Sequence, residues 1–248
     1  MDGPRIGDAF GELLLAAHAG RDAYGAIERD DGLLTPHAGE IYFTGPADWS
    51  DLDRTARDRS TGRVLDAGCG AGRHSLHLQE RGVDVTAIDP SPGACQVTRA
   101  RGVRKVHQVR LEDLPGLGER FDTFLLLGNN LALLGSPEHA DVVLDALARS
   151  ATPHAQVLGA CRDPYVTDEP THLAYHAHNR RQGRAGGQTR LRSRYGRLAD
   201  PWFDYLFCSQ DELAQLTAHS PWRLTGIERT GAGYLAELRL RRPGDQPA

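Results

Sequence analysis

Cysteine is scarce in this sequence, and its four residues are widely scattered: Cys69, Cys95, Cys161 and Cys208. There is no CxxC pair, which argues against a zinc ribbon or a thioredoxin-type redox site. Isolated cysteines are typical of a reducing compartment, so we expect a cytoplasmic protein. The first 20 residues carry acids early and have no basic segment ahead of an apolar run. This pattern argues against a secretory signal.

Long hydrophobic runs are also missing. No stretch of 18 apolar residues occurs in the 248-residue chain, so no membrane-spanning helix is expected. Hydrophobic residues make up 40% of the chain and charged residues 25%, which is ordinary for a soluble globular protein. The length suits one α/β domain with some additional structure.

Acidic residues are absent from 170–199, a segment that contains seven arginines, although the whole chain has a net charge of -4. Without these arginines the chain would stand at about -11, so its positive charge is confined to one segment. Few aromatic residues accompany it, whereas nucleic-acid grooves combine positive charge with stacking aromatics. The pattern therefore argues against nucleic acid as a partner. Two roles remain open: holding an anionic small acceptor, or forming salt bridges within the protein or across an oligomer interface.

Short apolar runs alternate with stretches of helical spacing from residue 62 onward. Such a rhythm predicts βαβ units and a parallel sheet with helices on both faces. The solid run FLLL at 124–127 fits a strand buried on both sides. We expect a doubly wound, Rossmann-like α/β fold with seven mostly parallel strands, the last one antiparallel. The expected strands are 63–67, 83–89, 105–109, 121–128, 154–161, 222–231 and 233–241.

The flanking segments differ from this core. We expect one or two helices over 5–28, a loop over 29–46 and a polar helix over 47–60. After Cys161 the rhythm stops for about 45 residues, too long for an ordinary connection. The later part of this insertion alternates like a β-hairpin and places three arginines on one strand face: Arg190, Arg192 and Arg194. The rhythm resumes at Ser209, which forms a capping box with Glu212.

These features predict three parts. They are an N-terminal helical lid (1–61), a core (62–162 and 209–242) and an inserted substrate cap or interface hairpin (163–208).

The stretch VLDAGCGAGRHSLHL at 64–78 lies between the first strand and its helix, where backbone N–H groups face a ligand. The dinucleotide fingerprint GxGxxG is not met, because its third glycine position is occupied by Arg73. An acid, Asp66, is followed instead by glycines at every second position: Gly68, Gly70 and Gly72. An acid in the loop suits a cationic ligand, and glycines let the backbone approach it closely. A tight turn that needs glycine for packing alone is the other interpretation.

This DxGxGxG motif resembles that of the class I S-adenosylmethionine-dependent methyltransferases. The resemblance covers 62–161 well and 209–241 moderately. It implies S-adenosylmethionine as cofactor and S-adenosylhomocysteine as product. The flanking segments resemble a broad set of bacterial small-molecule methyltransferases, typical of secondary metabolism. The NPPY and DPPY signatures of many base-modifying enzymes are absent, which lowers the case for an RNA substrate.

The resemblance implies further cofactor-binding residues along the chain. Asp89 ends the second strand, where a carboxylate accepts ribose hydroxyls or, alternatively, caps a turn. After the third strand, Arg110 replaces the aspartate that many relatives place near the adenine, which leaves Leu111 and Glu112 as candidates. Gly128 and Asn129 follow the fourth strand, although asparagines there also commonly cap the next helix.

Catalytic candidates lie directly after the fifth strand. Tyr165, His172 and His176 are candidates for the general base, and a spacing of four residues places the two histidines on one helix face. No third ligand is evident, so we expect no metal. Helix packing is the competing interpretation for His176. Five residues are candidate contacts to the acceptor, with packing as the alternative for the tyrosines: Tyr24, Tyr42, Tyr175, Arg180 and Arg181.

Taken together, the sequence predicts an enzyme that transfers a methyl group to an oxygen or nitrogen of a small molecule, with carbon still open. It would act as a monomer or homodimer. A non-catalytic cofactor-binding regulator or partner subunit, an NAD-dependent dehydrogenase and an RNA methyltransferase remain as alternatives.

Overall fold

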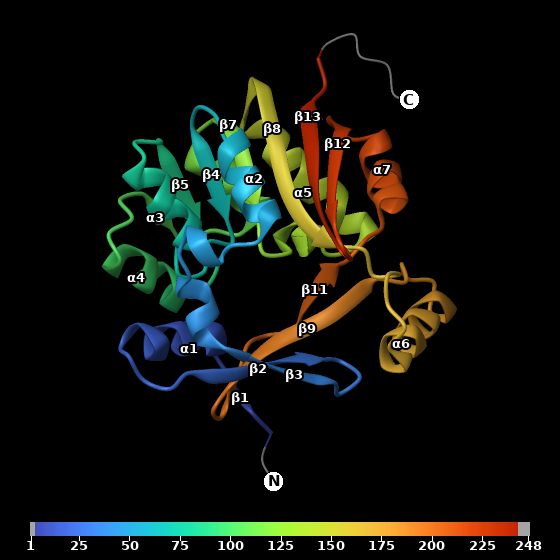
Figure 1. Ribbon diagram of the computed structural model, residues 1–248. Helices are drawn as coiled ribbons and strands as arrows, with labels where there is room; N and C mark the ends of the chain where they lie inside the picture. Colours follow the sequence, from blue (N-terminus) through green and yellow to red (C-terminus); the bar gives the residue numbers. More distant parts are fainter. Residues whose placement is uncertain (1–2, 243–248) are drawn as a thin grey trace. The chain divides into compact units, whose positions relative to one another are not determined.

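A computed structural model describes residues 3–242 (Figure 1). Contacts divide the chain into two compact units. The first comprises residues up to 49, 68–110 and 190–203, and the second comprises 50–67, 111–189 and the chain from 204 onward.

The first unit contains a mostly antiparallel sheet built from distant parts of the sequence. Its strand order is β1-β10-β9-β2-β3 (Figure 1). The strands are β1 (Arg5–Ile6), β2 (Tyr24–Arg29), β3 (Leu34–Ala38), β9 (Gln188–Tyr195) and β10 (Leu198–Ala199). β2 pairs with β9 through Ala26 and Arg194 and with β3 through Gly25 and His37. An N-terminal strand and a strand of the insertion are therefore neighbours in one sheet.

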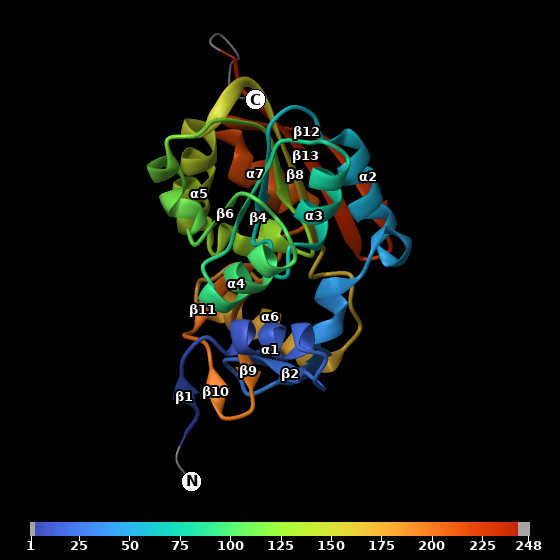
Figure 2. The ribbon, with the colours of Figure 1, turned by 90° about the vertical axis from the view of Figure 1, so that its left-hand side faces the viewer.

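Helix α1 (Ala9–His18) lies between this sheet and helix α4 (Pro92–Ala100), as Figure 2 shows. Leu13 packs with Ala23 and Tyr195 on the sheet side. On the other side, Leu14 packs with Val97 of α4. An apolar residue on each side of the helix is what a helix sandwiched between two layers requires.

The rest of the first unit follows the predicted βαβ rhythm. Strands β5 (Val85–Ile88) and β6 (Val106–His107) pair in parallel, and α3 (Arg73–Glu80) precedes β5. Ser91 caps α4 by accepting a hydrogen bond from the Ala94 N–H, with Pro92 in the first turn. Two short 3₁₀ helices, η1 (Gly39–Phe43) and η2 (Pro46–Asp48), connect β3 to the second unit's first helix.

The second unit contains five core strands in the order β12-β13-β8-β7-β4. They are β4 (Val64–Ala67), β7 (Phe121–Leu126), β8 (Ala151–Arg162), β12 (Trp222–Thr230) and β13 (Gly233–Leu240). β4, β7 and β8 run parallel, and β13 runs antiparallel to both of its neighbours. With β5 and β6, all seven strands predicted for the core are present, and the last is antiparallel as expected.

Four helices belong to the second unit: α2 (Asp51–Arg59), α5 (Pro137–Arg149), α6 (Pro170–Arg181) and α7 (Gln210–Ala218). Serines begin three of them, and the predicted capping box of Ser209 and Glu212 is formed. Trp222 on β12 is fully buried and donates its indole N–H to the Leu144 carbonyl on α5, 2.9 Å away. The remaining elements are η3 (Leu111–Leu117), η4 (Asn130–Leu134) and β11 (Phe203–Leu206).

The N-terminal segment differs from the expectation. Helix was predicted over 5–28, but α1 ends at His18 and the following residues form β2. The expected loop over 29–46 contains β3 and η1. The predicted lid is therefore part strand rather than wholly helical, because β2 gains its hydrogen bonds from β9, a partner that local sequence does not reveal. The insertion, in turn, contains helix α6 besides the expected hairpin of β9 and β10.

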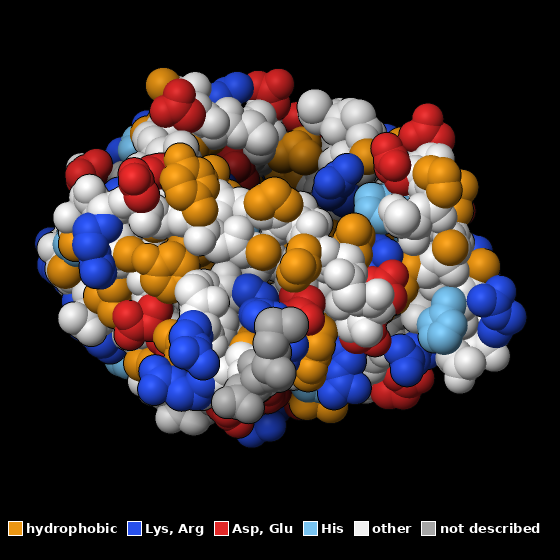
Figure 3. All heavy atoms as spheres, turned by 90° about the horizontal axis from the view of Figure 1, so that it is seen from below, with side chains coloured by type: hydrophobic (Ala, Val, Ile, Leu, Met, Phe, Trp, Pro, Cys, Tyr) orange, Lys and Arg blue, Asp and Glu red, His pale blue; other side chains and the backbone are white. Residues whose placement is uncertain are grey.

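The arginines of β9 have a structural partner. Arg192 Nε and Arg194 Nη1 both donate to Glu28 Oε2, at 2.8 and 2.7 Å, and Arg192 also stacks on Trp202. The Glu28 side chain is only 17% exposed, so the ion pairs join β2 and β9 in a partly buried setting. Figure 3 shows basic side chains interspersed with acidic and apolar ones on the face that it draws. The expectation that this arginine face makes salt bridges is confirmed for these two residues.

The insertion begins and ends beside one buried tyrosine. Tyr234 pairs with Cys161 across the β13–β8 ladder and donates its hydroxyl to the Cys208 carbonyl, 2.8 Å away. Cys161 precedes the insertion and Cys208 ends it, and all three residues are 1% exposed.

Among residues 3–242, no helix is both long and apolar enough to cross a membrane.

Candidate functional site

The glycine loop of the first unit adopts a conformation that requires its glycines. Gly68, Gly70 and Gly72 all have positive φ angles, of 71°, 56° and 72°. At Gly72 an added Cβ would lie 2.7 Å from Thr98, so packing alone explains this position. At Gly70 an added Cβ would meet only two aromatic rings, Tyr42 at 3.5 Å and Phe10 at 3.7 Å. The two rings are therefore in van der Waals contact with the Cβ position of Gly70, so an aromatic cover packs directly on the loop.

Asp89 fixes this loop to the end of β5. Its Oδ2 accepts the Gly70 N–H at 3.0 Å and its Oδ1 accepts the Ser91 N–H at 2.9 Å. The residue is 4% exposed, so it is not a surface residue, but through the Ser91 N–H it also caps the following turn, as the competing interpretation held. A carboxylate oxygen can accept more than one hydrogen bond, so both oxygens can still accept hydroxyl donors of a ligand.

Asp8 is a further acid of this site that the sequence reasoning missed. It caps α1 through the Gly11 N–H and also accepts hydrogen bonds from Ser91 Oγ and the Gly93 N–H of α4. One carboxylate thus joins the starts of two helices, where their dipoles favour negative charge. An aspartate just before an apolar helical run signals a helix cap, but nothing local signals the second helix.

Tyr42 covers the loop from η1. Its ring packs edge-on against Phe10, with centroids 5.0 Å apart, and against His37 at 5.9 Å. Burial raises the pKa of Tyr42 to about 12, so its phenol stays protonated at neutral pH. The candidate contact Tyr42 is therefore at the glycine loop. Tyr24, by contrast, begins β2 with 70% of its surface exposed and lies outside this cluster.

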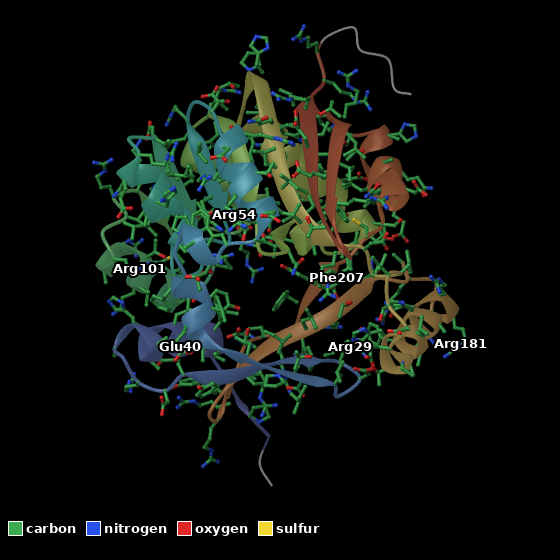
Figure 4. All side chains as sticks on the ribbon, viewed as in Figure 1. Arg29, Glu40, Arg54, Arg101, Arg181 and Phe207 are labelled. Carbon is green, nitrogen blue, oxygen red and sulfur yellow. The ribbon has the colours of Figure 1, made fainter. Side chains whose placement is uncertain are left out.

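Arginines hold the 3₁₀ segment that carries Tyr42. Arg73 donates to Thr44 Oγ1 at 3.0 Å. Arg101, labelled in Figure 4, places its guanidinium 5.0 Å from the centre of the Phe43 ring and donates to the Ala71 carbonyl at 2.6 Å. Both arginines follow the glycine loop in sequence, so the loop and its aromatic cover are tied together.

The catalytic candidates of the insertion gather in the second unit. The Tyr165 hydroxyl donates to Glu212 of the capping box, and the Arg180 guanidinium lies 5.1 Å from the Tyr165 ring centre. The His176 ring packs edge-on to Tyr165 at 5.6 Å and is 8% exposed. Burial, with Glu212 second, raises the pKa of Tyr165 to about 12. A phenol that is protonated and bonded to a carboxylate is better suited to positioning than to accepting a proton.

The remaining predicted residues of the second unit occupy separate places. His172 lies on α6, and its Nδ1 is 3.3 Å from Thr167 Oγ1. Tyr175 lies on the same helix and is buried. Arg181 is exposed at the end of α6 (Figure 4). Within residues 3–242, no three side chains of the metal-binding kinds form a group.

The end of β4 is also ordered by an amide that the prediction did not select. Asn130 donates to the Ala67 carbonyl at 3.0 Å and accepts from the Tyr205 hydroxyl at 3.0 Å. Its neighbours Gly128 and Asn129 both have positive φ angles, of 65° and 73°. Asn129 is the only non-glycine residue with this conformation among the described residues, and it begins η4. Asp66 is buried at 2% exposure on β4 itself, and Leu111 at 7% begins η3 beside Glu112.

Comparisons with known proteins fit this geometry. Residues 64–154 match a family described as a methyltransferase domain. The glycine/sarcosine N-methyltransferase of Aphanothece halophytica is 31% identical over 46% of this chain and 43% of its own. The ubiquinone biosynthesis O-methyltransferase of Azorhizobium caulinodans is 41% identical over 26% of this chain and 28% of its own. The chain thus spans less than half of the length of these curated relatives.

One solved structure matches over nearly the whole length. It is a methyltransferase from Bacteroides fragilis in complex with S-adenosylhomocysteine, with a TM-score of 0.81, 25% identity and 94% of both chains covered. The match confirms the Rossmann-like fold with its seven-stranded, mostly parallel sheet, and it includes the flanking segments that the resemblance covered only broadly. The sequence, the loop and the comparisons agree in supporting a class I S-adenosylmethionine-dependent methyltransferase.

Proposed function

We propose that this protein transfers a methyl group from S-adenosylmethionine to an oxygen or nitrogen of a small molecule. The observation that carries the proposal is the glycine loop with Asp89. A glycine loop without side chains, a buried carboxylate bonded to Gly70 and an aromatic cover together fit a ligand that carries hydroxyl groups and a positive charge.

The fit assigns distinct tasks to the residues of the first unit. Asp89 would accept the hydroxyl groups of the ribose, and Gly68, Gly70 and Gly72 would let the ligand approach the backbone. Phe10 and Tyr42 would shield the site from water. The proposed cofactor contacts elsewhere in the chain are those expected from the sequence: Asp66, Leu111, Glu112, Gly128 and Asn129.

The chemistry needs little from the protein beyond positioning. S-adenosylmethionine supplies the methyl group, bonded to a positively charged sulfur, and the leaving group. The chain has to hold the acceptor atom about 3 Å from the methyl carbon and in line with the bond that breaks. A neutral amine needs no base, whereas a hydroxyl or an ammonium group has to lose a proton.

The names of the curated relatives support small acceptors, since they are N- and O-methyltransferases of such compounds. For the acceptor itself we keep the contacts expected from the sequence, Tyr42, Tyr175, Arg180 and Arg181. The arginines would suit a carboxylate or phosphate. Tyr165, His172 and His176 stay proposed as residues of the catalytic region, with Tyr165 in a positioning role. Tyr24 stays a proposed acceptor contact as well.

Calorimetric titration with S-adenosylhomocysteine and with NAD tests the cofactor. We expect binding of the first only, and Asp89→Ala should weaken it by about tenfold or more through the loss of hydrogen bonds. The matched control is Asp84→Ala, which removes an exposed acid that pairs with Lys105 at the other end of β5. Binding of NAD alone would support a dehydrogenase, and unchanged affinity in Asp89→Ala would contradict the placement of the ribose.

A turnover assay tests the activity. The protein is incubated with methyl-labelled S-adenosylmethionine and a bacterial metabolite extract, and both S-adenosylhomocysteine and labelled products are measured. Formation of a labelled small molecule supports the proposal. Cofactor binding without product from any extract would instead favour a regulator or partner subunit.

A further inference from the structure

His37 stands out among the histidines because its polar atoms are buried without a partner. Both ring nitrogens are inaccessible to solvent, and neither has a hydrogen-bond partner among the described residues. An imidazole always carries at least one N–H donor, and a neutral one also has an acceptor nitrogen. Leaving both unsatisfied is unfavourable, because each group loses the hydrogen bonds that it makes to water in the unfolded chain. Buried polar groups without partners are rare enough in native proteins to require an explanation.

The location of His37 supplies one. It lies on β3 opposite Gly25, which has no side chain, and its ring packs edge-on to Tyr42 with centroids 5.9 Å apart. Tyr42 in turn lies 3.5 Å from the Cβ position of Gly70. His37 is therefore one aromatic ring away from the loop where the cofactor is proposed to bind. All of these residues belong to the first unit.

The charge state of His37 suits proton uptake. Its pKa is lowered by burial alone, and no neighbouring charge contributes to the shift. The groups that face it are the Tyr42 ring of η1 and the glycine of β2. The imidazole is therefore neutral at pH 7 and retains a nitrogen that can accept a proton.

The other ionisable groups around the loop are less suited to this task. Tyr42 keeps its proton because its pKa is about 12. Asp89 accepts the N–H groups of Gly70 and Ser91, and Asp8 accepts those at the starts of α1 and α4. Both carboxylates are thus engaged in holding the loop and its helices, whereas His37 performs no such structural bonding through its ring.

We propose that His37 contacts the methyl acceptor and takes up the proton that methylation releases. This inference rests on the proposed function. As the acceptor oxygen or nitrogen forms its bond to the methyl carbon, the carbon–sulfur bond breaks and its electron pair stays on sulfur. The acceptor proton passes to the free ring nitrogen of His37 and leaves to solvent when the products dissociate.

The first experiment locates His37 relative to the transferred methyl group, on the unaltered protein. Histidine side chains are labelled with ¹⁵N, and the pKa of His37 is measured by NMR in two complexes. One contains S-adenosylhomocysteine, and the other contains sinefungin, an analogue with an amine in place of the methyl group. His37→Gln assigns the signal, and His18, which is exposed and stacks on Phe43, is the internal control.

An ammonium group about 6 Å from an imidazole in a partly buried site should lower its pKa by about one unit or more. We therefore expect a lower pKa of His37 with sinefungin than with S-adenosylhomocysteine, and no difference for His18. If both compounds bound and the pKa of His37 were the same in the two complexes, this inference would be overturned and the proposed function would stand. Failure of both compounds to bind would overturn the two together.

The second experiment measures turnover with labelled S-adenosylmethionine and the metabolite extract described above. His37→Gln should keep its affinity for S-adenosylhomocysteine and lose about 100-fold or more in rate, the size typical of a general base. Because burial lowers the pKa of His37, the rate of the unaltered protein should fall at a pH lower than the ordinary histidine value of about 6.5, and His37→Gln should lack this fall. His18→Gln should behave like the unaltered protein. A rate of His37→Gln within about twofold of that control would contradict the proposal.

Discussion

The parallel strands of the core and the antiparallel strands β2, β3 and β9 are held together differently. In β4, β5 and β7 nearly every residue is buried, and apolar side chains dominate. In β2, β3 and β9 most residues are only partly buried, and Glu28 joins Arg192 and Arg194. Burial of apolar surface depends little on salt or pH, whereas ion pairs depend on both. The two regions should therefore respond differently to the same perturbations.

The largest loss of stability is expected in the parallel core. Phe124 of β7 is fully buried and packs edge-on to Phe121 and Trp222. Phe124→Ala should lower the free energy of unfolding by about 4 kcal/mol, because it leaves a cavity. Denaturant unfolding measures the change, and it should be the same at low and high salt. Val142→Ala, at a position 51% exposed, is the control. If Phe124→Ala lowered the free energy of unfolding by less than Val142→Ala does, the core would have to relax and fill the cavity.

A smaller loss is expected in the antiparallel sheet. Glu28→Gln should cost about 2 kcal/mol, since two arginines lose a charged acceptor. Hydrogen bonding to Arg192 lowers the pKa of Glu28 from 4.5, so the folded state binds its proton less readily than the unfolded state. The stabilisation is present above about pH 4.5 and is lost as the pH falls through the lower folded value. Unfolding of the two proteins at pH 7 and pH 3.5 measures this, and an equal difference at both values would contradict it.

The buried His74 should make the stability of the protein depend on pH between about pH 7.5 and 5.5. Burial, followed by the charge of Arg73, lowers its pKa to about 3 from 6.5. The unfolded chain therefore binds a proton that the folded one rejects, and stability falls as the pH drops below about 6.5. At pH 5.5 the loss should be about 1.5 kcal/mol. His74→Phe, which keeps a ring against Trp49, should lack this part of the pH dependence. Parallel curves for the two proteins between pH 7.5 and 5.5 would show that His74 is not the cause.

The smallest effect is expected for an exposed arginine of the insertion. Arg181 is exposed at the end of α6, and Arg181→Ala should change the free energy of unfolding by less than about 0.5 kcal/mol. Urea unfolding of Arg181→Ala and of Arg192→Ala compares the loss of stability at an exposed arginine with the loss at a salt-bridged one. Equal losses in both would mean that the salt bridges of β9 contribute no more than an exposed charge.

The sequence predicted the parts of this protein whose causes are local. The strands of the core carry solid apolar runs, and the loop carries glycines that its backbone conformation requires. The capping box at Ser209 lies within four residues. The strands β2 and β3 were missed because β2 pairs with β9, whose residues lie far away in the sequence. Asp8 was missed for the same reason: its partner Gly93 is distant in sequence.

The site shows the same division. The spacing of the loop indicated the ligand class, and the position of Asp89 followed from the end of a predicted strand. His37 was not predicted, because it is distinguished by the lack of hydrogen-bond partners for its ring nitrogens, and the spacing of residues in a sequence does not reveal such a lack. The arginine-rich segment was ambiguous because its composition suits both an anionic ligand and salt bridges. Only the register of β2 against β9, which places Glu28 opposite Arg192, distinguished these roles for part of the segment.

The position of Tyr234 has a consequence for how this protein can vary. Because Cys161 and Cys208 both adjoin this tyrosine, the insertion starts and finishes at nearly the same point of the second unit. A chain segment anchored in this way can change in length at a small entropic penalty, since that penalty grows only with the logarithm of the length. The parts of the insertion outside β9, which pairs with β2, could therefore differ in length while β8 and α7 keep their places. Tyr234 thus fixes where the inserted segment leaves and rejoins the second unit, and leaves the length between these points open to change.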